Sequence, residues 1–112
     1  MIISKLTELP TGKVSHNEKI SKKQILDNST HSALTQFAQA TFPPGEIAGG
    51  HSHSDMTEVF FIQSGSGTIV IDQQSFAIDA GTTITVQPGE EHQLENTGDE
   101  DLVVLYFGLA GE

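Results

Sequence analysis

The stretch GEIAGGHSHSDMTEVFFIQSG, residues 45–65, contains the feature that decides the fold of this chain. It places His51 and His53 two residues apart, so on an extended strand both imidazoles point to the same face. Glu58 follows after four further residues, at the start of a β-prone run. Imidazole and carboxylate together are ligands that divalent transition metals accept. The stretch therefore predicts a metal site built on β-structure.

A second stretch, GTTITVQPGEEHQLEN over residues 81–96, supplies a third imidazole at His92. The two stretches resemble the two motifs of the cupin family, G(X)5HXH(X)3–4E(X)6G and G(X)5PXG(X)2H(X)3N. Every spacing is met, with one departure: Gln87 holds the proline position, and the proline follows at Pro88. On these residues the chain is identified as a member of the cupin family over roughly residues 34–108.

The resemblance implies a metal centre with four protein ligands, His51, His53, Glu58 and His92. The expected cofactor is one divalent transition-metal ion, which could be Fe, Mn, Ni, Cu, Co or Zn. The alternative is a chain whose histidines only satisfy hydrogen bonds in the core. Asn96 closes the second motif, and we expect it to stabilise a turn.

The residues themselves favour the same fold. A chain of 112 residues forms one domain. Short β-prone runs recur between turn residues, and no segment has a helical pattern. Gly65-Ser66-Gly67 is expected to be a hairpin turn. The prediction is an all-β, single-domain cupin jelly-roll β-barrel. Its expected strands span residues 34–42, 58–63, 68–72, 75–78, 82–86, 92–96 and 102–107.

The first 33 residues have a different character, since all five lysines lie there. Ile2-Ile3, Leu6 and Ile25-Leu26 could each supply a short edge strand. We expect residues 1–33 to form an N-terminal arm that packs on the barrel, residues 34–112, or on a dimer partner. Because open sheet edges need covering, a homodimer is expected. The alternative is a loosely ordered tail.

The charge distribution limits the partners. The net charge is −10, the chain has no arginine, and it has no lysine from Gln24 onward. Nucleic acid and anionic membrane surfaces are therefore not expected as partners, because both are bound through Lys and Arg. A pocket made from residues 34–108 offers an anion no cationic side chain apart from histidine. A small neutral or metal-chelating substrate is expected, unless a lysine of the arm reaches the mouth of the pocket.

Several side chains are candidates for the pocket wall. If Glu58 points inward, Phe60 and Ile62 share its face by the two-residue period of a strand. Packing in the core is the alternative role for each candidate. The residues expected to line a substrate pocket are Gln36, Phe37, Met56, Phe60 and Tyr106.

Two classes of function remain. The first is a dioxygenase-like metal enzyme in which Glu58 could also act as the catalytic general base. The second is a non-catalytic module that binds or senses a small molecule, and a metal-dependent isomerase or lyase is a further alternative. The chain has no cysteine, and its first residues lack the apolar core of a signal peptide. A cytoplasmic location is therefore expected.

Overall fold

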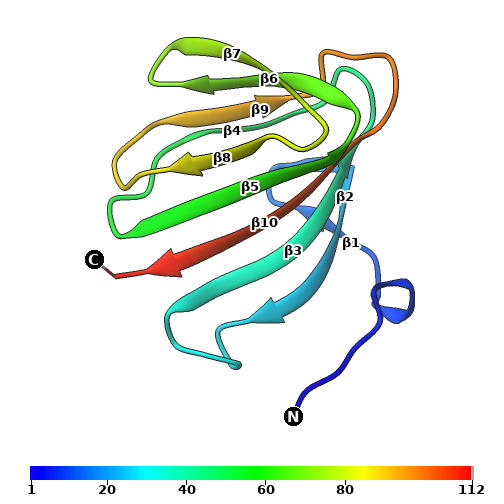
Figure 1. Ribbon diagram of the computed structural model, residues 1–112, viewed down its shortest axis with the longest axis vertical. Coiled ribbons are helices and arrows are strands. Elements are labelled where there is room, and N and C mark those ends of the chain that lie inside the picture. The colour runs from blue at the N-terminus through cyan, green and yellow to red at the C-terminus, as the bar shows by residue number, and fades with distance from the viewer. Residues whose placement is uncertain (112) are drawn as a thin grey trace.

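Two antiparallel β-sheets face each other and enclose the core (Figure 1). The computed structural model describes residues 1–111, without the side chain of His51. A single turn of 3₁₀-helix, η1, precedes the strands. The elements are η1 (Leu6–Glu8), β1 (Gly12–Val14), β2 (Asn17–Asp27), β3 (Leu34–Phe42), β4 (Ile47–His51), β5 (Met56–Ser64), β6 (Ser66–Ile71), β7 (Gln74–Asp79), β8 (Thr83–Val86), β9 (His92–Glu95) and β10 (Leu102–Ala110).

The larger sheet has six strands in the order β1-β2-β3-β10-β5-β8, and the smaller has four in the order β4-β9-β6-β7. Every pair of neighbouring strands is antiparallel. The all-β jelly roll expected from the sequence is therefore confirmed. No helix in the part of the chain that the structure describes is long and apolar enough to cross a membrane.

The core lies between the inner faces of the two sheets. On β5 the buried side chains alternate as Glu58, Phe60 and Ile62, while Phe61 between them is 41 % exposed. The shared face predicted for these residues is thus confirmed. Burial of this apolar surface is the main force that holds the sheets together. The core cluster comprises Ile20, Ala40, Phe42, Phe60, Ile62, Ile69, Ile78, Val86, Leu94, Leu102 and Val104.

Residues 12–27 form the outer strands β1 and β2 of the six-stranded sheet. Strand β2 pairs with β3 of the same chain, with Lys22 opposite Ala40, and its Ile20 is fully buried in the core. Of the three segments suggested as short edge strands, only one lies in a strand. Ile2-Ile3 precedes the first strand, Leu6 begins η1, and only Ile25-Leu26 lies in a strand.

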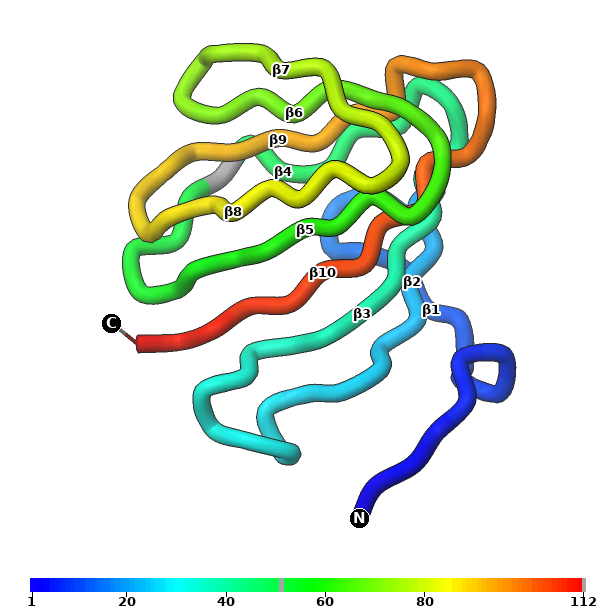
Figure 2. Tube along the Cα trace, in the orientation of Figure 1, coloured from blue at the N-terminus to red at the C-terminus, as the bar shows by residue number. Residues whose placement is uncertain are grey.

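The chain passes from one sheet to the other at Gly65, as Figure 2 shows between β5 and β6. The expected hairpin turn at Gly65-Ser66-Gly67 is wrong, because β5 belongs to the larger sheet and β6 to the smaller. Gly65 has a φ of +88°, and a Cβ there would collide with the backbone carbonyl oxygen of Asp101. Only glycine fits this corner.

Asn96 has the structural role predicted for it. Its side chain is fully buried at the end of β9. Its Nδ2 donates to the backbone oxygens of Phe42 and Glu100, both at 2.8 Å, and its Oδ1 accepts from the Gly98 N–H at 2.9 Å. One amide group thus ties the β9–β10 turn to the end of β3.

Candidate metal centre

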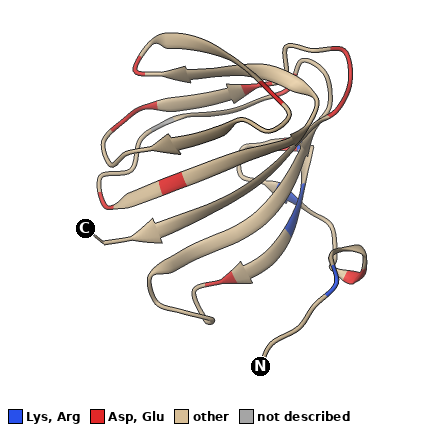
Figure 3. Ribbon diagram, in the orientation of Figure 1, with Lys and Arg blue, Asp and Glu red and all other residues tan. Residues whose placement is uncertain are grey.

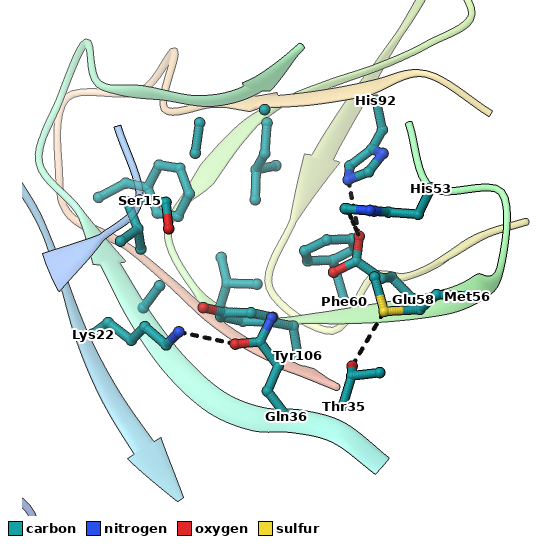
Figure 4. A pocket seen from close by; sticks show the side chains of 17 residues that line it. Ser15, Lys22, Thr35, Gln36, His53, Met56, Glu58, Phe60, His92 and Tyr106 are labelled. Atoms are coloured by element: carbon teal, nitrogen blue, oxygen red, sulfur yellow. Dashed lines mark hydrogen bonds and ion pairs between the residues drawn. The ribbon is translucent and has the colours of Figure 1, made fainter. Parts of the chain in front are cut away.

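The predicted ligands come from strand ends and a loop at one end of the barrel. Glu58 lies on β5 of the larger sheet, His92 begins β9 of the smaller sheet, and His53 lies in the loop between β4 and β5. Potential ligand atoms of these three side chains all lie within 4.8 Å of one another. Figure 4 shows them turned toward one another. The side chain of His51, the fourth predicted ligand, lies outside the described residues.

Glu58 provides the test of whether this cluster suits a cation. Its side chain is buried, and its Oε1 lies 3.1 Å from His92 Nε2 and 3.7 Å from His53 Nε2. Apart from these two imidazoles, no described residue offers this oxygen a hydrogen-bond donor. A buried carboxylate that faces only imidazoles is costly unless a positive charge, on an imidazole or on a metal ion, compensates it. The three donor groups therefore fit a divalent transition metal, which would bind both the oxygen and the imidazole nitrogens.

His92 is more enclosed than His53, with 5 % of its surface exposed. Its interaction with the Glu58 carboxylate raises the pKa of His92 above the ordinary 6.5, against the lowering effect of burial. Its Nδ1 lies 3.5 Å from the backbone oxygen of Glu90, which turns Nε2 toward the cluster. Since a metal binds the neutral imidazole, protons and metal compete for this nitrogen.

The turn before His92 explains the one departure from the family motif. The Gln87 N–H donates to Glu90 Oε1 at 2.7 Å, a hydrogen bond that a proline at this position could not make. The Gly89 N–H donates to the His53 backbone oxygen at 2.7 Å. The β8–β9 turn is thereby joined directly to the loop that carries His53.

A cavity of about 310 Å³ opens in front of the cluster, between the two sheets. This volume is at the lower end of the range for small-molecule sites. The side chains predicted for its wall, Gln36, Met56, Phe60 and Tyr106, all line it, whereas Phe37 does not. The described residues that line it are Val14, Ser15, Lys22, Thr35, Gln36, Ala40, Phe42, Ala48, Gly49, His53, Met56, Glu58, Phe60, His92, Leu94, Val104 and Tyr106.

Aromatic rings form the wall beside the cluster. Phe60 lies with its ring centroid 5.9 Å from that of His92 and stacks on Tyr106 at 5.6 Å. Burial, with a smaller contribution from the Glu58 charge, raises the pKa of Tyr106 to about 12. Its hydroxyl is therefore protonated at neutral pH and available as a hydrogen-bond donor.

Lys22 is a lining residue that the sequence did not single out, although it left open that a lysine of the arm reaches the pocket. It belongs to β2, and its Nζ donates to Gln36 Oε1 at 2.9 Å across the β2–β3 pair. The cavity therefore has a cationic side chain from the segment 1–33, which is the exception that the charge argument left open. The only signal in the sequence was the period of two that places Lys22 on the same face as the buried Ile20.

Acidic side chains outside the cavity are spread over loops and strands of the whole chain, whereas the lysines remain on the N-terminal segment and its strands (Figure 3). The cavity contrasts with this surface. Its wall is mostly apolar, and within the described residues Glu58 is its only acidic side chain. The low dielectric of such a wall strengthens any interaction between a ligand and the polar groups that it does contain.

Comparison with known proteins agrees with this description. An oxalate-binding protein of Thermotoga maritima is 32 % identical over 94 residues, which are 84 % of this chain and 74 % of that protein. A crystal structure from Thermotoga maritima, described as a predicted oxalate decarboxylase, superposes with a TM-score of 0.90 at 25 % identity and covers 97 % of this chain and 99 % of that one.

A third similarity concerns the fold alone. The structure of a cupin sugar phosphate isomerase from Silicibacter pomeroyi has a TM-score of 0.82 at 19 % identity, over 94 % of this chain and 73 % of that one. Residues 38–108 match the family described as the cupin domain. With this match over more than half of its length, the chain belongs to the cupin family.

Proposed function

We propose that the protein holds one divalent transition-metal ion through His51, His53, Glu58 and His92 and uses it to bind a small oxygen-chelating ligand. The observation that carries the proposal is the cluster of His53, Glu58 and His92 at the end of a cavity, in which the buried Glu58 Oε1 faces two imidazole nitrogens and no other donor of the described residues. When bound, such an ion acts as a Lewis acid toward an oxygen ligand. Naming His51 as the fourth ligand rests on the motif spacing.

The surrounding residues suit a compact ligand with closely spaced oxygen atoms. Phe60 and Tyr106 offer a flat apolar wall, and the Tyr106 hydroxyl remains a neutral donor. The similarity to a protein named for oxalate binding supports a ligand of this chemistry. We therefore place small carboxylates and other chelating oxygen compounds first among the candidates.

We further propose that the ligand is turned over in a dioxygenase-like reaction, with Glu58 as the proton acceptor. Glu58 is the one carboxylate among the described lining residues, so a proton leaving a bound ligand has this acceptor within the cavity. Burial beside Phe60 excludes bulk water from it. Tyr106 orients the ligand through its hydroxyl group.

Binding without turnover is the second candidate, and the name of the oxalate-binding relative favours it. An isomerase or lyase reaction is the third, since a structural neighbour is named a sugar phosphate isomerase. The cavity suits a sugar phosphate less well, because phosphate groups are usually bound by several cationic side chains or by a helix N-terminus.

One experiment separates the first two candidates. Protein loaded with Fe(II) or Mn(II) is titrated with oxalate, acetylacetone and catechol, while oxygen uptake is followed with an electrode. Binding together with oxygen uptake that Glu58→Gln abolishes supports the enzyme, and binding without uptake supports the module. A matched control, His16→Asn, removes an exposed imidazole outside the cluster and should change neither result. Absence of binding to the loaded protein would contradict both.

We also propose that the protein is a homodimer assembled through its N-terminal segment. Met1, Ile2 and Ile3 are 109 %, 71 % and 84 % exposed, an unusual position for three apolar side chains. Strand β1, which follows this segment in the sequence, is an outermost strand of the larger sheet. Sedimentation should reveal a species of twice the 12.0 kDa chain mass. A clean monomer at micromolar concentration would rule the dimer out.

A further inference from the structure

Lys22 places a positive charge inside the cavity. Strand β2 turns the half-buried Lys22 toward the same side as the buried Ile20, so its side chain lines the cavity. Its Nζ donates to Gln36 Oε1 at 2.9 Å. The partner is thus a neutral amide. The arrangement brings one cation and one amide side chain together in a mostly apolar wall.

This charge has no acidic partner. In the part of the chain that the structure describes, no carboxylate oxygen lies within 4 Å of Lys22 Nζ, although the sequence contains fifteen acidic residues. Burial lowers the pKa of Lys22, which means that the charged form pays a desolvation cost at this place. An anion entering the cavity would offset that cost.

Lys22 and the metal ligands lie at opposite ends of the cavity (Figure 4). Gln36 on β3 and Glu58 on β5 both pair with Gly108 of the strand between them. With about 4.8 Å between neighbouring strands, their Cα atoms are about 10 Å apart. A ligand that uses both ends must therefore separate its anionic group from its chelating group.

We propose that Lys22, together with Gln36, binds a carboxylate group of the ligand whose other end is held at the metal centre. The inference rests on the proposed metal-dependent binding and adds the ligand class, an anionic chelator with a distal carboxylate. A single lysine without any arginine matches the one negative charge of a carboxylate better than the higher charge of a phosphate group.

The test uses two probes that differ only at their far end. Both 2-oxoglutarate and 2-oxopentanoate chelate a metal through the 2-oxo acid group, but only the first carries a distal carboxylate. Calorimetry with the Mn(II)-loaded protein should show that 2-oxoglutarate binds about 10-fold or more tightly, as expected for a charge-assisted hydrogen bond in a partly buried site. In Lys22→Met this preference should fall to less than about 3-fold.

Two controls keep this inference separate from the proposed function. Lys19→Met makes the same change of charge at an exposed position of β2 and should keep the wild-type preference. Oxalate, which lacks a distal group, should bind the wild type and Lys22→Met alike, and this also shows that the variant is folded. If oxalate binds but the wild type does not prefer 2-oxoglutarate, or Lys22→Met retains the preference, the role of Lys22 is refuted. If oxalate does not bind to the loaded wild type, the metal-dependent function itself fails.

Discussion

At the scale of single residues, the Glu58–His92 pair determines how the centre responds to protons. Glu58 Oε1 and His92 Nε2 lie 3.1 Å apart, and the carboxylate favours the protonated imidazole. A metal ion requires the neutral imidazole in the same place. Protonation of His92 and metal binding therefore depend on the same Glu58 carboxylate, and the two exclude each other.

The first prediction concerns pH. Because the pKa of His92 is raised above 6.5, its protonated form stabilises the metal-free fold below that value, and this contribution is lost as pH rises through the pKa of the folded protein. Metal affinity should follow the opposite trend and increase with pH over the same range. Apparent dissociation constants for Zn²⁺ from pH 5.5 to 8 check this. An affinity that does not change across that range would contradict the assigned competition.

At the same scale, the sequence identified the clustered side chains His53, Glu58 and His92 more readily than the rest of the cavity. The spacing around His51, His53, Glu58 and His92 is local, so a motif is sufficient to find it. The place of Lys22 depends on the register of β2 against β3, in which Lys22 pairs with Ala40. That register is set by packing between segments far apart in the sequence, and the sequence alone did not reveal it.

At the scale of elements, glycines define where the chain changes sheet. Gly65 at the β5–β6 corner and Gly81 before β8 both have positive φ, at +88° and +91°. A Cβ at Gly65 would meet the Asp101 carbonyl oxygen and lie 3.0 Å from Leu102 Cα, whereas nothing lies within 4 Å of a Cβ at Gly81. The two positions thus share the backbone strain but differ in the space around them.

The second prediction uses this difference. Gly81→Ala should lower the free energy of unfolding by about 1 kcal/mol, since it adds only left-handed strain. Gly65→Ala should lower it by about 3 kcal/mol or more, because backbone must also move away from the new Cβ. Urea unfolding of both variants measures the two values. Equal losses would show that the corner is not as tightly packed as described.

Elements with regular apolar patterns were predicted with nearly correct bounds, and the others were missed. Strand β3 spans Leu34–Phe42, the range expected from the sequence. The eleven residues of β2 include three lysines and a glutamate, so their β-structure was not visible in composition. Strand β4 contains Gly49-Gly50, which resembles a turn, and pairs with β9 through tertiary contacts.

At the scale of the whole molecule, the metal centre would link the two sheets. Glu58 belongs to the six-stranded sheet and His92 to the four-stranded sheet, so one ion bound to both resists their separation. Metal binding should therefore increase the free energy of unfolding, because the unfolded chain does not hold the ligands together.

The third prediction is that metal stabilises the fold. At a free metal concentration 100 times the dissociation constant, the free energy of unfolding should increase by about 2.7 kcal/mol. Thermal unfolding with Mn²⁺ or Zn²⁺ and after removal of metal with EDTA measures the difference. In Glu58→Ala the ions should give little or no increase. A wild-type melting temperature that is the same with and without metal would contradict a centre that joins the sheets.

The measurement that tests the central claim most directly is the metal content of untagged protein, by mass spectrometry of digested samples. Purification avoids nickel columns, and His51→Ala, Glu58→Ala and the control His16→Asn are prepared in parallel. We predict close to one equivalent of a divalent transition metal in the wild type and in His16→Asn, and its loss in the other two variants. A wild type that holds no metal, even after reconstitution with each first-row ion, would contradict the claim and leave His51, His53, Glu58 and His92 with a structural role only.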